Sequence, residues 1–263
     1  TRASAASYVD RYGVVKSAAI DVSREESEGW LIEGASTNEA LYSEDLASTA
    51  WAFTDAGLTY NTTTAPDGAS TASTLTEGVA SSAHDMTYPS NITVATSVPF
   101  TISVFMKYNG RQWAQVRQST TVTGAVFFDL INGVVGDISG TGSPSGEIKS
   151  MGDGWFRCSL TCTTTGTQAR TKIRLSDTDG VTSYQGDGAS GIYVWGFQTE
   201  DSLPFASSYI ATTSSAVTRA ADLVSCAVDN NLVSGAITDH SFSTSFKTLG
   251  ANGTMNLYRT STP

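Results

Sequence analysis

Four segments in the middle of the chain place apolar residues at every second position. They are residues 100–107, 112–118, 155–162 and 169–175. In the first of them the apolar set is Phe100, Ile102, Val104 and Met106. Successive side chains of a β-strand point to opposite faces, so a period of two predicts half-buried strands. Helical periodicity is almost absent from the sequence.

Turn-forming residues separate these segments. Clusters of Gly, Pro, Asp and Asn occur at residues 65–68, 109–110, 140–146, 152–154 and 185–188. Residues 191–198 are apolar on both faces, which is typical of a central, fully buried strand. Many short strands with Gly, Asp and Asn turns are typical of a β-sandwich. We therefore expect an all-β fold with two antiparallel sheets.

Composition and charge exclude several classes of protein. Hydrophobic residues make up 40% of the 263 residues and charged residues only 15%, so the chain can bury a core but is a poor coiled coil. No run approaches the roughly 18 apolar residues that a membrane helix needs, so we expect no membrane insertion. The net charge of −10 opposes binding to nucleic acid. The basic residues are concentrated in residues 107–174, while residues 25–106 contain no Lys or Arg.

The sequence contains no pattern that predicts catalysis or a cofactor. Cys158 and Cys162 share the parity of neighbouring core positions, so we expect small, reduced core residues, with synthesis in a cytosol. The histidines, His84 and His240, are expected at the surface. A Gly-x-Ser-x-Gly spacing at residues 142–146 has Pro where the nucleophile would be. Paired carboxylates in turns are expected to be solvated, and we predict that the chain is not an enzyme.

Changes in composition suggest four segments. We expect an N-terminal arm or edge strand at 1–34, the sandwich at 35–211 and a linker at 212–222. Residues 223–263 would then be the start of a second β module or strands that dock on a neighbouring subunit. The motif Thr1-Arg-Ala-Ser-Ala is echoed by Thr218-Arg-Ala-Ala-Asp, which is either chance or a repeat that opens each module.

Several segments, taken together and in order, resemble the modules of bacteriophage virion appendages, namely head-fibre or head-spike, tail-fibre and tailspike proteins. The segments are Arg2-Ala-Ser-Ala-Ala-Ser-Tyr-Val-Asp10, Leu31-Ile-Glu-Gly-Ala-Ser-Thr-Asn38, Tyr42-Ser-Glu-Asp45 with Trp51, Ala65-Pro-Asp-Gly68, Gly154-Trp-Phe-Arg157, Gly191-Ile-Tyr-Val-Trp-Gly-Phe-Gln198, Ser208-Tyr-Ile210 and Thr218-Arg-Ala-Ala-Asp222. Such modules are similar to jelly-roll carbohydrate-binding modules. The resemblance covers roughly residues 1–225.

The resemblance implies a two-sheet jelly roll on the surface of a phage particle, made in the bacterial cytoplasm. It also implies a homotrimer, other virion proteins as partners, and host-surface polysaccharide as a ligand. Many carbohydrate-binding jelly rolls hold a structural calcium through an acidic residue in the last strand. Here residues 192–198 lack one until Glu200, so no clear motif supports a structural calcium, which stays an open alternative, and no other cofactor is expected. No functional residue is carried over from the family.

Alternation along the expected strands suggests one candidate binding surface. Its residues are Trp113, Gln115, Arg117, Arg157, Arg170, Lys172 and Arg174. If their strands share a sheet, an aromatic ring and several cations face outward together, which suits an anionic polysaccharide. The alternative is that Trp113 packs under a loop and the basic residues pair with the acidic half of the chain.

Three functions fit these expectations. The first is a fibre or spike module that projects from the virion and binds host-surface glycan. The second is a purely structural decoration or assembly module that contacts only other virion proteins. The third is the non-catalytic binding appendage of a polysaccharide depolymerase.

Overall fold

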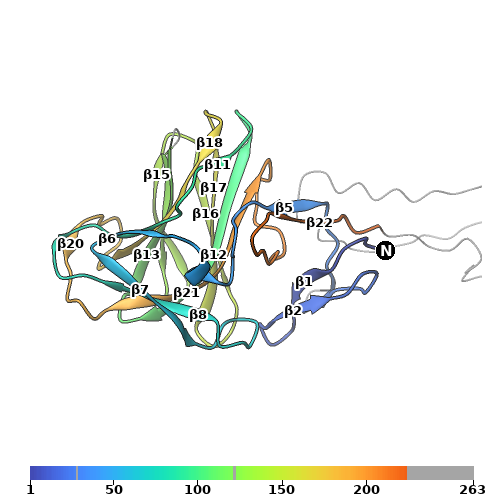
Figure 1. Cartoon of the computed structure of the whole chain (residues 1–263), viewed down its shortest axis with the longest axis horizontal. Coiled ribbons are helices and arrows are strands. Elements are labelled where there is room, and N and C mark those ends of the chain that lie inside the picture. The colour runs from blue at the N-terminus through green and yellow to red at the C-terminus, as the bar shows by residue number, and fades with distance from the viewer. Residues whose placement is uncertain (28, 121–122, 224–263) are drawn as a thin grey trace, which may run out of the picture.

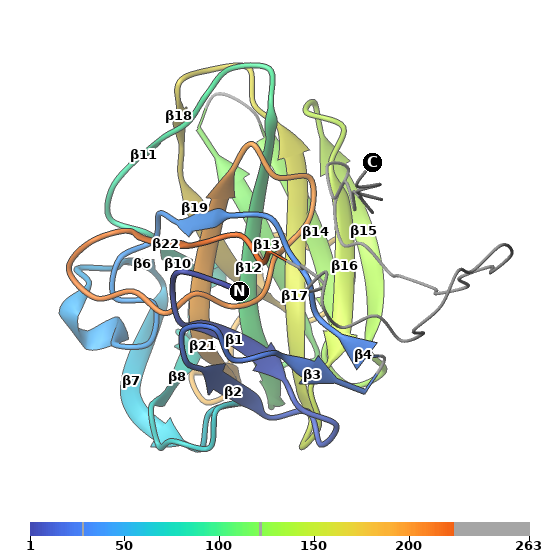
Figure 2. The same ribbon diagram turned by 90° about the vertical axis from the view of Figure 1, so that its right-hand side faces the viewer.

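The computed structural model describes residues 1–27, 29–120 and 123–223, and this part of the chain is an all-β sandwich. Two six-stranded antiparallel sheets are stacked face to face (Figures 1 and 2). Among the described residues the only helix is a single 3₁₀ turn, η1 (Leu46–Ser48). The expected fold class is confirmed. No helix in the described ranges is long and apolar enough to cross a membrane.

We call the two layers sheet I and sheet II. Sheet I has the strand order β15-β14-β13-β19-β10-β6, with β15 at Val134–Gly140, β14 at Thr123–Asp129, β13 at Trp113–Ser119, β19 at Thr171–Ser176, β10 at His84–Thr87 and β6 at Ala52–Thr54. Sheet II has the order β16-β17-β12-β21-β8-β7, with β16 at Ser145–Ser150, β17 at Trp155–Thr163, β12 at Pro99–Asn109, β21 at Gly191–Asp201, β8 at Ala72–Glu77 and β7 at Ala56–Thr63.

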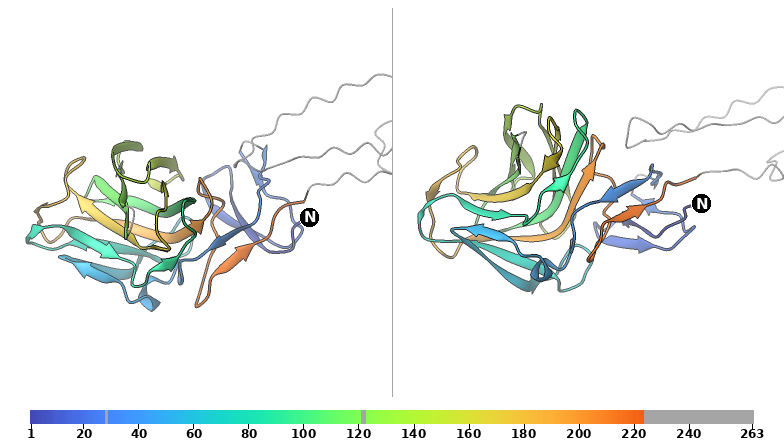
Figure 3. Two further views of the ribbon diagram at one scale, coloured as in Figure 1. Left: turned by 90° about the horizontal axis from the view of Figure 1, so that it is seen from above. Right: turned by 45° about the horizontal axis from the view of Figure 1, so that its top comes forward.

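Shorter strand pairs complete the described part of the chain. They are β1 (Ala6–Val9) with β2 (Val15–Ala18), β3 (Glu25–Glu26) with β4 (Gly29–Trp30), β5 (Ser36–Asn38) with β22 (Val217–Arg219), β9 (Ser81–Ser82) with β20 (Tyr184–Gln185), and β11 (Ile92–Thr93) with β18 (Gln168–Ala169). The pairs β1–β2 and β5–β22 lie together on the outer side of sheet II, close to the N-terminus (Figures 1 and 3).

The main core lies between the two sheets and contains the apolar sets expected from the alternation. Ile102 is paired with Leu160 in sheet II, and Val116 with Ile173 in sheet I, and all four side chains are fully buried. Each such burial stabilises the fold by roughly 1.5–3 kcal/mol. Cys158 and Cys162 also lie in this core as free thiols, as expected. Burial raises the pKa of the Cys162 thiol to about 11.

A second apolar cluster covers the outer face of sheet II. Phe105 and Trp195 lie there with ring centroids 5.3 Å apart, and Tyr209 packs on both rings. Val15 of the hairpin β1–β2 belongs to the same cluster, so the N-terminal segment packs behind sheet II. The two large apolar clusters of the described residues therefore lie on the two sides of sheet II.

The segment expected to be a linker, residues 212–222, contains β22, which pairs with β5. Beyond it, the Thr1 and Leu223 backbones hydrogen-bond to each other, and the Ala220 N–H donates to Ser4 Oγ at 2.9 Å. The two Thr-Arg-Ala motifs thus lie side by side. Residues 224–263, for which we expect a second module or docking strands, lie outside the described residues.

A buried ion cluster connects the same two parts of the chain. Arg24 forms ion pairs with Glu33 and Asp222, and Arg2 pairs with Asp222 at 3.1 Å. Arg219 lies 3.6 Å from Glu33. The three arginines are each no more than 3% exposed. The residues before the sandwich and those after it are therefore bound together by charge.

The expectation that His84 lies at the surface is wrong. Its ring is fully buried, with Nδ1 2.7 Å from the Asp55 carbonyl oxygen and Nε2 3.3 Å from the Tyr184 carbonyl oxygen. His84 has the parity of Met86, which faces the core, and the segments that carry Asp55 and Tyr184 supply its polar partners. His240 lies outside the described residues.

Candidate functional site

The outer face of sheet I brings together five of the seven candidate residues. Ala114 and Val116 of β13 point into the main core, so Trp113, Gln115 and Arg117 point outward. The neighbouring strand β19 presents Lys172 and Arg174 on this face. The register places Gln115 beside Arg174 and Arg117 beside Lys172.

Arg157 is not part of this face, because its strand β17 belongs to sheet II. Its guanidinium donates to the Ser207 carbonyl at 2.7 Å and to Ser103 Oγ at 2.9 Å, and it lies over the Phe105 ring. Burial lowers the pKa of Arg157, against the opposing charge of nearby carboxylates such as Glu200. Arg157 therefore helps to hold the outer layer of sheet II.

Arg170 lies just before β19 and is separate from the row formed by Lys172 and Arg174. It donates to the Pro89 carbonyl at 3.1 Å. Alternation alone places Arg170 in line with Lys172 and Arg174, but the regular strand begins only at Thr171.

Asp85 of β10 neutralises part of the basic row. Arg174 donates to Asp85 through Nε at 2.6 Å and Nη2 at 3.0 Å, and Lys172 Nζ donates at 2.9 Å. Burial by itself raises the pKa of Asp85, but these hydrogen bonds and charges lower it below its usual value. For Lys172 and Arg174 the alternative expectation therefore holds, since they pair with the acidic half of the chain. Sequence reasoning missed Asp85, because only the strand order puts β10 beside β19.

Arg117 is the cation of this face that has no partner among the described residues. It is partly exposed and makes no hydrogen bond or ion pair with any described residue. Lys172, its neighbour across the strand pair, is held by Asp85. A ligand that carries a negative group would therefore find Arg117 free to bind it in a bidentate way.

Trp113 is partly exposed and lies against a glycine. A Cβ atom on Gly136 of β15 would be 2.5 Å from Trp113 Cζ3 and 2.3 Å from Asp179 Oδ1. The Asp137 N–H donates to that same carboxylate oxygen at 2.8 Å. Trp113 is thus positioned by β15 and by the segment around Asp179.

Between Trp113 and Arg117 lies a buried row of side chains. By register it contains Phe127, Gln115, Arg174 and Asp85, each less than a tenth exposed. Trp113 and Arg117 lie four residues apart along β13, about 13 Å at the usual rise of a strand. The face therefore has a fixed centre with an aromatic ring at one end and a free cation at the other.

The described residues contain no group of three or more His, Cys, Asp or Glu side chains arranged to hold a metal ion. Three carboxylates at this face are engaged. Asp85 is held by two cations, Asp179 by a backbone amide, and Asp129, which lies opposite Trp113 in the register, by Gln112, Asn132 and backbone amides.

No protein-family model matches the sequence, and no curated protein matches it. Among solved structures, the chain is similar to the CBM22-1–GH10 modules of the N-terminal endo-1,4-beta-D-xylanase 10B of Clostridium thermocellum, complexed with xylohexaose. The identity is 13%, the TM-score is 0.31, and the match covers 64% of this chain and 28% of that chain. A likeness this distant assigns neither a ligand nor an activity to the chain.

Proposed function

We propose that this chain is a glycan-binding module of a bacteriophage fibre or spike, with the outer face of sheet I as its binding surface. The observation that carries the binding part is that Trp113 and Arg117, which has no partner among the described residues, lie on one face of β13 on either side of the buried row. The virion part of the proposal, and with it the trimer and the location on the particle surface, rests on the resemblance of the sequence and stays a prediction.

The chemistry of the face favours an acidic polysaccharide. A partly exposed indole ring can stack on the C–H groups of a pyranose, and a free guanidinium binds a carboxylate through two parallel hydrogen bonds. Each contact contributes on the order of 1 kcal/mol or more. The net charge of the chain is −10, but salt screens exposed charges that lie more than about 8–10 Å away. The nearby cations therefore determine the electrostatic interaction of this face with an anionic ligand.

Binding is measured with the full chain on an array of bacterial surface polysaccharides, followed by calorimetric titration of the best acidic glycan. We expect the double variant Trp113→Ala, Arg117→Ala to weaken binding about 30-fold, which corresponds to about 2 kcal/mol lost in two contacts. The matched control, Trp30→Ala with Lys16→Ala, removes an exposed Trp and an exposed cation elsewhere and should bind like the unmodified chain.

Unchanged affinity in the Trp113→Ala, Arg117→Ala variant would remove the face of sheet I from consideration. Absence of binding to any polysaccharide would favour the purely structural module. Release of reducing ends by the longer protein that carries this module would favour the appendage of a depolymerase.

A further inference from the structure

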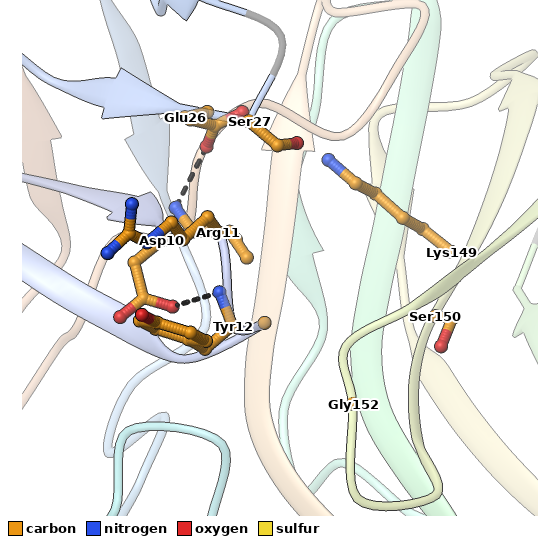
Figure 4. Close-up of a pocket in the computed structure, with 10 residues that line it drawn as sticks. Asp10, Arg11, Tyr12, Glu26, Ser27, Lys149, Ser150 and Gly152 are labelled. Carbon is orange, nitrogen blue, oxygen red and sulfur yellow. Dashed lines mark hydrogen bonds between the residues drawn. The ribbon is translucent and has the colours of Figure 1, made fainter.

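A hollow lies away from the face of sheet I, between the N-terminal hairpin and sheet II. It has a volume of about 300 Å³ and is lined by the turn at residues 10–13, by Glu26 and Ser27, and by Lys149, Ser150 and Gly152 (Figure 4). Small-molecule sites usually measure roughly 300–1,000 Å³, so this hollow suits a small ligand or one unit of a chain. It shares no residue with the face of sheet I.

The walls of this hollow are fixed by the backbone. Asp10 Oδ1 accepts hydrogen bonds from the N–H groups of Tyr12 at 2.9 Å and Val14 at 3.0 Å. Glu26 Oε1 accepts from the Val9 N–H at 2.8 Å. One oxygen of each carboxylate thus accepts hydrogen bonds from the backbone, while its second oxygen makes no hydrogen bond with the described residues. The hollow therefore offers two positioned acceptors.

The same walls carry donors that have no partner in the described part of the chain. Lys149 forms no ion pair or hydrogen bond, and in Figure 4 its amine reaches across the hollow toward Ser27. The Arg11 guanidinium lies over the Tyr12 ring, 4.9 Å from its centroid, and makes no ion pair. The Ser27 and Ser150 hydroxyls are likewise free of hydrogen bonds to described residues. Tyr12 itself is 70% exposed at the rim.

The charges in this lining cancel, because two cations face two carboxylates. A lining with no net charge gives a phosphate or carboxylate ligand no net attraction, whereas sugar hydroxyls can both donate to the Asp10 and Glu26 carboxylates and accept from Lys149. We infer that this hollow is a binding site for a single neutral hexopyranose unit. This site goes beyond the proposed function, since it lies on another surface and selects a neutral sugar instead of an acidic one.

The test is a titration of the ¹⁵N-labelled full chain with the methyl glycosides of glucose, galactose and mannose, followed by amide chemical shifts. Concentrations up to about 50 mM cover weak sites. We expect at least one glycoside to produce saturable shifts confined to residues 9–14, 26–27 and 149–152. Lys149→Ala and Glu26→Gln should each weaken that binding about fivefold, as for one lost hydrogen bond. Lys16→Ala, an exposed lysine outside the hollow, should leave it unchanged.

Methyl glucuronide provides the charged counterpart of methyl glucoside. Tighter binding of the glucuronide than of the glucoside at residues 9–14, 26–27 and 149–152, shifts from the neutral glycosides that leave these residues unmoved, or equal affinity of this hollow in Lys149→Ala would overturn the inference. So would the absence of saturable shifts with all three neutral glycosides. The dispersed amide spectrum of each variant shows at the same time that it has folded. These variants do not alter the face of sheet I. A negative result for this hollow therefore leaves the proposal about Trp113 and Arg117 to be tested by its own experiment.

Discussion

At the scale of single residues, Asp85 has the largest consequence for the candidate face. It is nearly buried and receives three hydrogen bonds from Arg174 and Lys172. Arg174 is itself only 7% exposed, so its charge has no access to bulk water as a substitute. The arrangement of Lys172 and Arg174 on the outer face of sheet I therefore depends on Asp85, which is not among the residues predicted to bind a ligand.

We predict that Asp85→Ala lowers the free energy of unfolding by about 3–5 kcal/mol, because it leaves the Arg174 charge buried and unpaired. Lys172→Ala should cost only about 1 kcal/mol or less, because the lysine is more exposed and Asp85 keeps Arg174. Urea denaturation measures both values. Equal losses in the two variants would contradict this account of the row.

The residues of the face show how far sequence alone leads. Alternation correctly assigned Trp113, Gln115, Arg117, Lys172 and Arg174 to outward positions, because parity is a local property. Pairing is not local: Asp85 meets Arg174 across 89 positions, and no spacing in the sequence reveals it. Arg157 has the right parity but the wrong sheet, since strand order decides which outward faces are shared.

At the scale of elements, the hairpin β1–β2 is attached to sheet II through a close backbone contact. Gly13 has φ of +83°, and a Cβ atom there would lie 2.1 Å from the Met151 carbonyl oxygen. Only glycine fits both the conformation and the contact. The turn of this hairpin also forms one wall of the hollow that contains Lys149.

We predict that Gly13→Ala lowers the free energy of unfolding by about 2–4 kcal/mol, through backbone strain together with the clash against Met151. Gly68→Ala is the matched control, because Gly68 has φ of +89° but open space around its Cα, and it should cost only about 1–2 kcal/mol. Chemical denaturation gives both values, and limited proteolysis should cut the Gly13→Ala variant first near residues 10–14. Equal costs in the two variants would show that the close contact contributes nothing.

The long strands could be predicted from the sequence more readily than the short strands and their pairing. The long strands β12, β13, β17, β19 and β21 follow directly from apolar alternation or from a continuous apolar run. The two- and three-residue strands, such as β9, β11 and β20, are too short to produce a pattern. Their positions are decided by partners that are distant in the chain, and for that reason β22 lies in a segment whose composition predicts a linker.

At the scale of the whole molecule, carboxylates within ion clusters connect stability to pH. Burial by itself raises the pKa of Glu33 and of Asp222. The charges of Arg219 and Arg24 lower the pKa of Glu33 overall, and the hydrogen bond from the Glu33 backbone N–H together with the charge of Arg24 lowers the pKa of Asp222 overall. The pKa of Asp85 is lowered in the same way. Glu39 and Glu44 have the opposite sign, since burial raises the pKa of each.

A carboxyl group whose pKa is lower in the folded state stabilises the fold above its unfolded pKa of about 4, and this contribution is lost as the pH falls through the folded pKa. We therefore predict that the melting temperature falls as the pH is lowered from 5 to about 3. In the Asp222→Asn variant the melting temperature at pH 7 should be lower, and its further fall on acidification smaller. Calorimetry at several pH values measures this. A variant that loses as much as the unmodified chain on acidification would exclude Asp222 from the linkage.

The pairing of Thr1 with Leu223 has a mechanical consequence. If the chain were pulled apart at these two residues, the force would first act on the hydrogen bonds between them and then on the buried ion cluster of Arg2, Arg24 and Asp222. The two sheets of the sandwich would bear no force until this ion cluster separated. Anything tethered through these two positions could therefore pull on the molecule without deforming the surface that carries Trp113 and Arg117.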